Sequence, residues 1–148
     1  TEVGQDSEVV RQPLPVPVGW SATRPIAIAE TGTTLFETFE TDGSDSVPHD
    51  TSECSYVNEI AHDVWFRFVA TASASRTLTT CDPDSVDTDV VVYEDGEQVA
   101  CNGDGPEDNS CQQYYSRVTF SVIAGREYLV RVGGYTENDF GQGRLTIG

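Results

Sequence analysis

The sequence predicts an all-β fold: an antiparallel two-sheet β-sandwich, jelly-roll-like, preceded by an extended N-terminal arm. From Trp20 onward, apolar residues recur at every second position in short runs, and turn signals separate these runs. Almost nothing recurs at helical spacing. The chain of 148 residues is near the usual size of one domain, so we expect a single sandwich domain over residues 20–148.

Residues 1–19 form the predicted arm. Its prolines alternate with apolar residues: Pro13, Leu14, Pro15, Val16, Pro17 and Val18. The prolines exclude a helix and remove the backbone donors of one strand edge, whereas the apolar residues keep the other edge intact and share one face. We expect this arm to add a strand to a neighbouring subunit. The alternatives are a polyproline-like linker and an arm that folds back onto its own domain.

Eight strands are predicted, a number that suits a two-sheet sandwich. They are Ile26–Ala29, Thr34–Phe39, Val64–Ala70, Arg76–Thr80, Thr88–Tyr93, Arg117–Val122, Glu127–Val132 and Arg144–Ile147. The two strands around Ala124-Gly125 alternate in step with each other, which predicts a hairpin. The run Val90–Val92 does not alternate, which predicts a strand covered on both faces.

The sequence indicates export and two disulfides. It contains no methionine, so we expect that a targeting segment has been removed. The cysteines are four in number and lack metal-site spacing: Cys54, Cys81, Cys101 and Cys111. Cys101 and Cys111 bracket a polar loop, so we expect them to pair with each other, and Cys54 to pair with Cys81. Buried free thiols are the alternative.

The charge balance excludes several partners. There are 25 acidic and 8 basic residues, a net charge of −17, and this charge repels nucleic acid and anionic membrane surfaces. No run approaches the roughly 18 apolar residues of a membrane helix, so membrane insertion is not expected. All the basic residues are arginine, which excludes chemistry at a lysine amine.

Acidic residues crowd the segment from Asp82 to Asp108, where 10 of 27 residues carry a carboxylate. The predicted calcium ligands are Asp82, Asp84, Asp87, Asp89, Asn102, Asp104 and Asp108, with Asn109 beside them. Hard oxygen ligands of this kind are the ones that calcium prefers, although the spacing is not that of an EF-hand. Asp42, Asp45 and Asp50 form a second acidic group. A solvated acidic surface is the alternative.

We expect no enzymatic activity. His49 and His62 are the only imidazoles, and no nucleophile-elbow, zinc-protease or phosphate-loop motif occurs. His62 beside Asp63 is typical of a loop histidine that leads into a strand rather than of a triad or a zinc site. Close carboxylate pairs are uninformative among so many acidic residues.

Three tyrosines are the predicted ligand-binding residues. Tyr114 and Tyr115 are adjacent, so at least one of them should face outward, and Tyr135 follows the Gly133-Gly134 pair in a predicted loop. Such side chains can stack on sugar rings. Trp65 and Tyr128, which lie in predicted strands, are expected to be packing residues instead.

Several segments in order resemble one known family. They are DVWFRF at 63–68, TLTTC, DTDVVVY, ACNGDG, SRVTFSVIAGREYLVRVGG and a closing GRLTI. Together they resemble the bacterial pre-peptidase C-terminal domain family over about residues 20–148, whereas the arm lies outside the resemblance. The resemblance implies an exported, non-catalytic, jelly-roll-like sandwich, usually attached to a secreted hydrolase or cell-surface protein. Some relatives bind calcium or an extracellular polymer.

The resemblance also bears on individual residues. Asp87 and Asp89 match the acidic residues where a strand of the family begins, and Asn102 and Asp104 match its acidic loop. The family pattern does not fix which of them contacts a metal.

Two functions are therefore predicted for a protein that is secreted, extracellular or at the cell surface. The first is a structural building block, stabilised by calcium, that assembles with copies of itself through Leu14, Val16 and Val18. The alternative is an accessory module of a secreted enzyme that binds a glycan or protein of the extracellular matrix.

Overall fold

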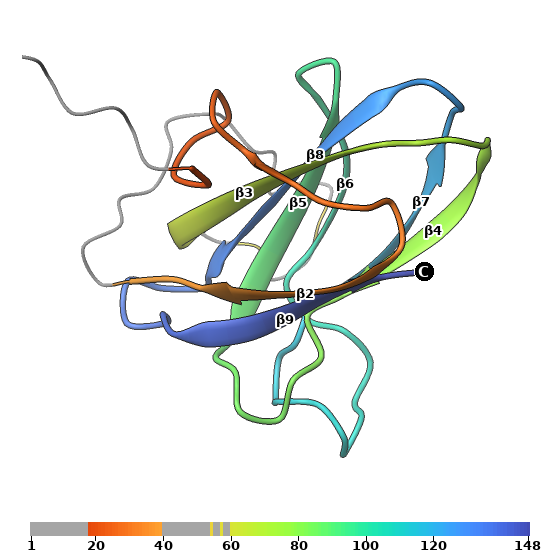
Figure 1. Ribbon diagram of the computed structural model, residues 1–148. Helices are drawn as coiled ribbons and strands as arrows, with labels where there is room; N and C mark the ends of the chain where they lie inside the picture. Colours follow the sequence, from red (N-terminus) through yellow and green to blue (C-terminus); the bar gives the residue numbers. More distant parts are fainter. Residues whose placement is uncertain (1–17, 40–53, 55–56, 58–59) are drawn as a thin grey trace, which may run out of the picture.

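The computed structural model describes residues 18–39, 54, 57 and 60–148 (Figure 1). Within them, nine strands form two sheets and no helix occurs, which confirms the predicted all-β sandwich. The strands are β1 (Ile26–Ala27), β2 (Gly32–Glu37), β3 (Ala61–Val69), β4 (Ala74–Thr79), β5 (Thr88–Glu94), β6 (Glu97–Asn102), β7 (Arg117–Val122), β8 (Glu127–Gly134) and β9 (Gln142–Ile147). A membrane-spanning helix is thus not found in the described ranges.

The strands divide into sheet A, in the order β1-β3-β8-β5-β6, and sheet B, in the order β2-β9-β4-β7. All neighbours in these sheets are antiparallel except β1 and β3, where Ile26 pairs with Phe66 in a parallel register. The segment before β2 follows the edge of β3, because Trp65 N–H donates to the Gly19 carbonyl at 2.8 Å and Ile28 N–H donates to the Arg67 carbonyl at 2.9 Å.

The main core lies between the two sheets. Phe68 and Tyr128 of sheet A stack with ring centroids 5.4 Å apart. Phe120 of sheet B approaches them, with centroid distances of 6.4 Å to Phe68 and 6.2 Å to Tyr128. Burial of such rings supplies most of the free energy that holds two sheets together.

The predicted hairpin around Ala124-Gly125 is wrong. β7 pairs with β4 in sheet B, whereas β8 pairs with β3 and β5 in sheet A, so the turn crosses from one sheet to the other. The alternation does predict which side chains are buried. Four of the predicted inward-facing residues are buried in the structure: Phe120, Val122, Tyr128 and Val130. They face one core from opposite sides, and a period of two does not distinguish this arrangement from pairing within one sheet.

A second core cluster covers the outer face of sheet A. Val91 and Trp65 are fully buried there, and Trp65 stacks on Tyr93 with centroids 5.5 Å apart. Val90 and Val92 point into the main core. The central strand β5 is therefore buried on both faces, as the unbroken valine run predicts.

β6 is a strand that the sequence analysis missed. It forms a true hairpin with β5 through Asp95-Gly96, whose φ angles of 51° and 80° fit a tight turn with both central residues left-handed. The Asp-Gly pair was a usable signal. The sequence pattern does not predict the strand itself, because Val99 and Ala100 are its only apolar residues before Cys101. A register shift also interrupts its pairing with β5.

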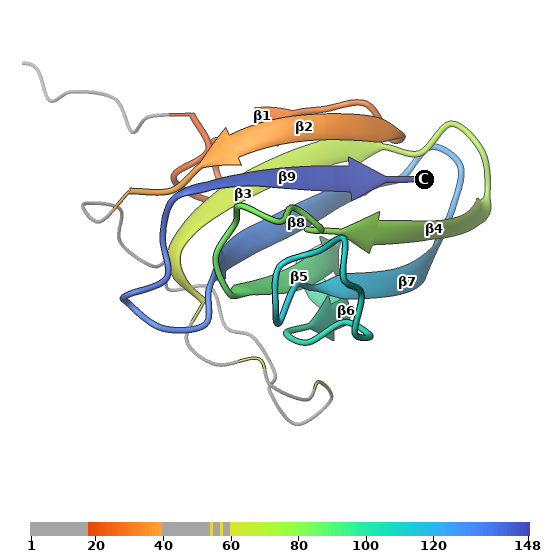
Figure 2. The same ribbon diagram turned by 90° about the horizontal axis from the view of Figure 1, so that it is seen from below.

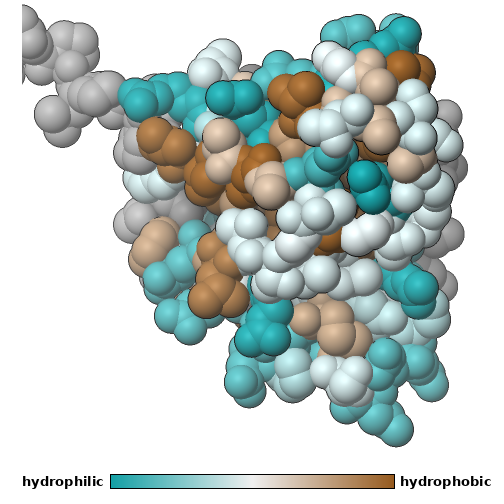
Figure 3. All heavy atoms as spheres, turned by 45° about the vertical axis from the view of Figure 1, so that its right-hand side comes forward, coloured by the Kyte–Doolittle hydropathy of each residue, from teal (hydrophilic) through white to brown (hydrophobic). Residues whose placement is uncertain are grey.

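Exposed hydrophobic side chains are spread over several elements. Leu35 on β2 is 73% exposed, Val69 on β3 46% and Ile123 after β7 43%. On the side seen in Figure 3, small groups of hydrophobic residues are interspersed with hydrophilic and intermediate ones. The described part of that side does not present one broad apolar face for assembly.

A buried ion pair lies beneath the second cluster. Arg131 Nε donates to Asp63 Oδ2 at 2.7 Å, and the two side chains are 1% and 0% exposed. The guanidinium carbon also lies 5.2 Å from the centre of the Trp65 ring, where a cation is attracted by the aromatic face. Removing one partner would leave the other charge buried without it.

We therefore expect Asp63→Ala to lower the free energy of unfolding by about 3–5 kcal/mol in urea denaturation. The matched control is Glu127→Ala, which breaks the pair between Arg67 and Glu127, whose side chains are 43% and 54% exposed. That variant should lose less than about 1 kcal/mol. Equal effects of the two substitutions would contradict this account of the buried pair.

Candidate ligand-binding site

Two loops lie side by side at one end of the sandwich: the β4–β5 loop, residues 80–87, and the β6–β7 loop, residues 103–116 (Figures 1 and 2). The side chain of Gln112 joins them. Its amide nitrogen donates to the carbonyls of Thr80 at 2.9 Å and Val86 at 3.2 Å, and its oxygen accepts from Asp82 N–H at 2.8 Å. One buried side chain thus satisfies three backbone groups of the neighbouring loop.

Buried hydroxyl groups add a second connection at the ends of the strands. Thr80 and Thr88 hydroxyls lie 2.6 Å apart. Ser116 N–H donates to the Thr80 hydroxyl at 2.9 Å, and the Ser116 hydroxyl donates to the Thr88 carbonyl at 2.6 Å. A satisfied network of this kind fixes the positions of its members.

Two disulfides complete these connections, with a pairing that differs from the predicted one. Cys81 bonds to Cys111, with Cα atoms 4.7 Å apart, and Cys54 bonds to Cys101, with Cα atoms 5.8 Å apart. The expectation failed because Cys101 belongs to β6 rather than to the loop, and its side chain joins the second core cluster with Cys54. Two formed disulfides are typical of proteins from oxidising compartments.

Tyr114 stands on this braced loop in an unusual backbone conformation. Its φ is 61°, which is rare for a large aromatic residue, and its side chain is 48% exposed. Strain of this kind persists only where the surrounding structure imposes it, and it occurs often at binding sites. At the pair of adjacent tyrosines, one residue does face outward, as predicted.

Tyr115, the other predicted binding residue of this pair, is largely buried. It is only 4% exposed, and its ring lies against Gly105, where an added Cβ would be 2.9 Å from the ring carbon Cζ. Gly105 N–H also donates to the Tyr115 carbonyl. Adjacent tyrosines point to opposite sides of the loop, so one of them anchors the loop and the other is presented to solvent.

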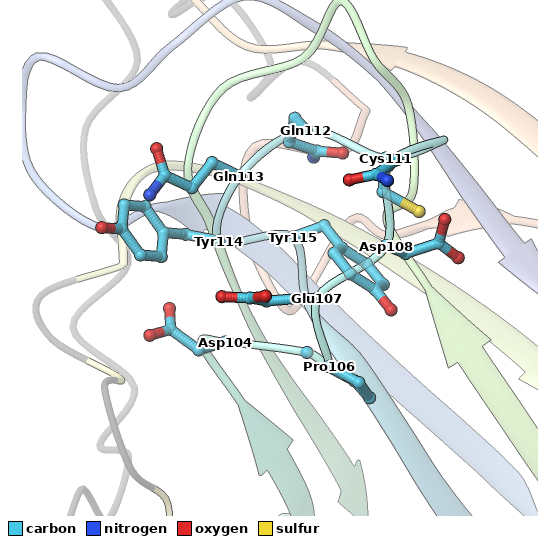
Figure 4. Close-up of a pocket in the computed structure, with 11 residues that line it drawn as sticks. Asp104, Pro106, Glu107, Asp108, Cys111, Gln112, Gln113, Tyr114 and Tyr115 are labelled. Carbon is cyan, nitrogen blue, oxygen red and sulfur yellow. The ribbon is translucent and has the colours of Figure 1, made fainter.

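Two hollows meet beside Tyr114. The smaller, about 310 Å³, is lined by Asp87, Asp104, Tyr114 and Tyr135. The larger, about 460 Å³, is formed by the β6–β7 loop and shares Asp104 and Tyr114 with the smaller one. Figure 4 shows the Tyr114 ring and the Asp104 carboxylate on the same side of this loop. Around the smaller hollow the structure thus brings together two of the predicted tyrosines and two of the predicted acidic residues, whereas Tyr115 and Asp108 line the larger one.

The β8–β9 loop supplies the third side of the smaller hollow. Tyr135 N–H donates to the Asp87 carbonyl at 3.3 Å. Asp139 shapes this loop, because its Oδ2 accepts bonds from both the backbone N–H and the hydroxyl of Thr136 at 2.9 Å. At Gly134 an added Cβ would overlap the Asp139 carbonyl oxygen, so this close approach requires glycine.

The electrostatics of the smaller hollow are unfavourable for a carboxylate. Burial, together with the negative charges of Asp139 and Asp104, raises the pKa of Asp87 to about 7. Burial also raises the pKa of Asp104. The Oδ1 atom of Asp87 is buried and accepts no hydrogen bond from the described residues. The sequence analysis missed Asp139 and Gln112, because nothing local marks either as close to Asp87 or Asp82.

The other predicted metal ligands lie apart from this hollow. Asp82 accepts from Asp84 N–H, Asn102 accepts from Arg117 N–H, and the Asp108 carboxylate caps Ser110. Asp89 is buried in β5. Among the described residues, no three His, Cys, Asp or Glu side chains gather as a metal site.

Some predicted residues lie outside the described ranges: Leu14, Val16, Asp42, Asp45, His49 and Asp50. Val18 is described and is 54% exposed. His62, the other histidine, contacts the β8–β9 loop, with Nε2 2.7 Å from the Glu137 carbonyl oxygen and its ring 5.4 Å from that of Phe140.

No family model matches the chain, and no curated protein sequence does either. Among solved structures, the pre-peptidase C-terminal domain of collagenase from Bacillus anthracis matches 91% of this chain and 100% of its own, with 12% identity and a TM-score of 0.57. This likeness confirms the predicted family resemblance at the level of the fold.

Two carbohydrate-binding modules of family 35 match less well. The one from Paenibacillus barcinonensis has 16% identity and a TM-score of 0.37, covering 80% of this chain and 94% of its own. The module described as Xyl-CBM35, in complex with a glucuronic acid containing disaccharide, has 15% identity and a TM-score of 0.37, covering 64% of this chain and 69% of its own. This chain is thus similar in fold to a pre-peptidase C-terminal domain.

The raised pKa of Asp87 predicts how the stability of the folded protein depends on pH. An aspartate with an ordinary pKa of 3.8 unfolded and about 7 folded takes up a proton on folding between these values, so stability falls as pH rises through that window. Asp87→Asn removes the charge and should raise the melting temperature at about pH 8 and much less at about pH 4. A melting temperature lowered equally at both values would contradict the assigned pKa.

Proposed function

We propose that this chain is a non-catalytic, extracellular binding module, and that the two hollows beside Tyr114 are its ligand site. The observation that carries the proposal is the combination at Tyr114: a half-exposed aromatic side chain, held in a strained backbone conformation by a clamped and disulfide-bonded loop, at the rim of both hollows. Preorganised aromatic side chains bind ligands with little loss of conformational entropy.

The unfavourable burial of Asp87 supports the same proposal. A carboxylate beside two others destabilises the folded protein at neutral pH, and such arrangements occur often at functional sites. The fold likeness to a domain of a collagenase supports an accessory role beside a secreted enzyme. The proposed ligand is a glycan or a protein of the extracellular matrix.

The proposal is tested by pull-down on insoluble polysaccharides and immobilised extracellular proteins. The informative variant is Tyr114→Asn, because asparagine adopts positive φ readily and the substitution removes the ring without forcing the backbone. We expect binding to the captured ligand to weaken about tenfold or more.

Leu35→Ala is the matched control for that experiment, because Leu35 is a large exposed hydrophobic residue outside both hollows. It should bind like the unchanged protein. If Tyr114→Asn binds as well as the control to every captured ligand, the two hollows are not the site.

Calcium is a further proposal for this domain. A divalent cation at acidic residues of this domain, including those outside the described ranges, would offset carboxylate repulsion. At about 100 times its dissociation constant, such an ion adds about 2.7 kcal/mol of stability. A chelator should therefore lower the melting temperature by several degrees, and millimolar calcium should restore it. Identical melting curves with chelator and with calcium would exclude calcium stabilisation.

Assembly through the arm stays a prediction, because its residues up to Pro17 lie outside the described part of the chain. Light scattering of the intact protein beside one lacking residues 1–18 tests it: large species that the truncation abolishes would support assembly through the arm, and assembly unchanged by the truncation would exclude it.

A further inference from the structure

The walls of both hollows carry negative charge only. Four carboxylates line them, those of Asp87, Asp104, Glu107 and Asp108, and none of the lining residues is basic. Asp139 adds its field at Asp87. The described ion pairs engage Arg67, Arg76, Arg126 and Arg131 elsewhere. Arg117 acts on Asp108 at the larger hollow, so the repulsion is concentrated at Asp87 and Asp104 of the smaller one. A positively charged ligand would relieve this repulsion, and an anionic ligand would add to it.

The tyrosines distinguish an organic cation from a metal ion. Tyr114 and Tyr135 line the smaller hollow together with the two aspartates. Aromatic faces attract ammonium and guanidinium groups, and this attraction grows where water is displaced. Calcium instead needs a set of six to eight oxygen ligands, and no metal-holding group of three acidic side chains occurs in the described ranges.

The depth of each side chain indicates the shape of the cation. Tyr114 stands at the rim with 48% of its surface exposed, whereas Asp87 lies deeper with one carboxylate oxygen buried. A ligand that enters here meets aromatic surface first and negative charge second. Lysine and arginine have this design, with an apolar stem and a charged tip. An amino sugar carries its ammonium group among hydroxyls and has no apolar stem.

The geometry points to a lysine or arginine side chain of an extracellular protein as the ligand of the hollow between Tyr114 and Tyr135. This inference rests on the proposed binding function and names the chemistry of its ligand. The stem packs between the two rings, and the charged group binds the carboxylates of Asp87 and Asp104. These 148 residues contain no lysine, so a lysine that binds here is not one of them.

The test is an NMR titration of the intact, disulfide-bonded protein with small probes, in chelator and at low salt. The probes are N-acetyl-lysine methylamide, N-acetyl-arginine methylamide, the uncharged isostere N-acetyl-norleucine methylamide, glucosamine and N-acetylglucosamine. We expect one or both of the charged amino-acid probes to shift the signals of Tyr114 and Tyr135 with an affinity that falls as salt rises. The norleucine probe should bind at least about tenfold more weakly.

Asp87→Asn is the sharpest variant, because it is expected to bind the charged probes about tenfold more weakly while the protein melts at a higher temperature near neutral pH. Lost binding in a more stable protein is not a folding defect. Asp84→Asn is the matched control: it removes the same charge from an exposed residue outside both hollows and should change the affinity less than about twofold.

Three results would overturn the inference. Equal binding of the norleucine and lysine probes would show that charge is not recognised. Stronger binding of glucosamine than of lysine or arginine would assign the site to an amino-sugar polymer. Absence of shifts with every probe, together with a Tyr114-dependent pull-down on a neutral glycan, would exclude a cationic ligand while leaving the proposed binding function intact.

Discussion

The structure depends on the burial of sheet A on both faces. Sheet B covers one face, and the second core cluster under the Cys54–Cys101 disulfide covers the other. A charged residue in or beside β5 and β8 is therefore partly or fully buried, and burial of a charge costs free energy unless the charge is paired. Arg131 meets this constraint by pairing with Asp63. Asp87, immediately before β5, instead lies near two further carboxylates.

The β4–β5 and β6–β7 loops form the surface around Asp87, and contacts between them hold that surface in place. Gln112, the Thr80–Thr88–Ser116 hydroxyl network and the Cys81–Cys111 disulfide all join the β4–β5 and β6–β7 loops. Because these contacts fix both loops, Tyr114 keeps a backbone conformation that a free loop would leave. Exposed aromatic surface, buried charge and rigidity thus meet at one place, which is why this place and no other in the described chain carries the proposed function.

The sequence predicted what depends on local pattern. Alternation identified the buried residues of β7 and β8, and the unbroken valines identified β5 as covered on both faces. It could not identify strand partners, because two strands on opposite sides of one core alternate like two strands of a hairpin. The disulfide pairing failed for the same reason, since it depends on β6 and on which side Cys101 faces. Composition placed Asp87, Asp104, Tyr114 and Tyr135 among the candidates, but only the fold selects these four together and adds Asp139.

The central claim is that Asp87 lies in a hollow lined by two carboxylates and by no basic residue of the described chain. The most direct measurement is the pKa of the Asp87 carboxyl in the intact protein, followed by NMR of the carboxyl carbon during a pH titration in chelator. This account requires a value near the assigned pKa of about 7, falling when a cationic probe is added. A pKa near the ordinary 3.8, unchanged by any cationic probe, would contradict it.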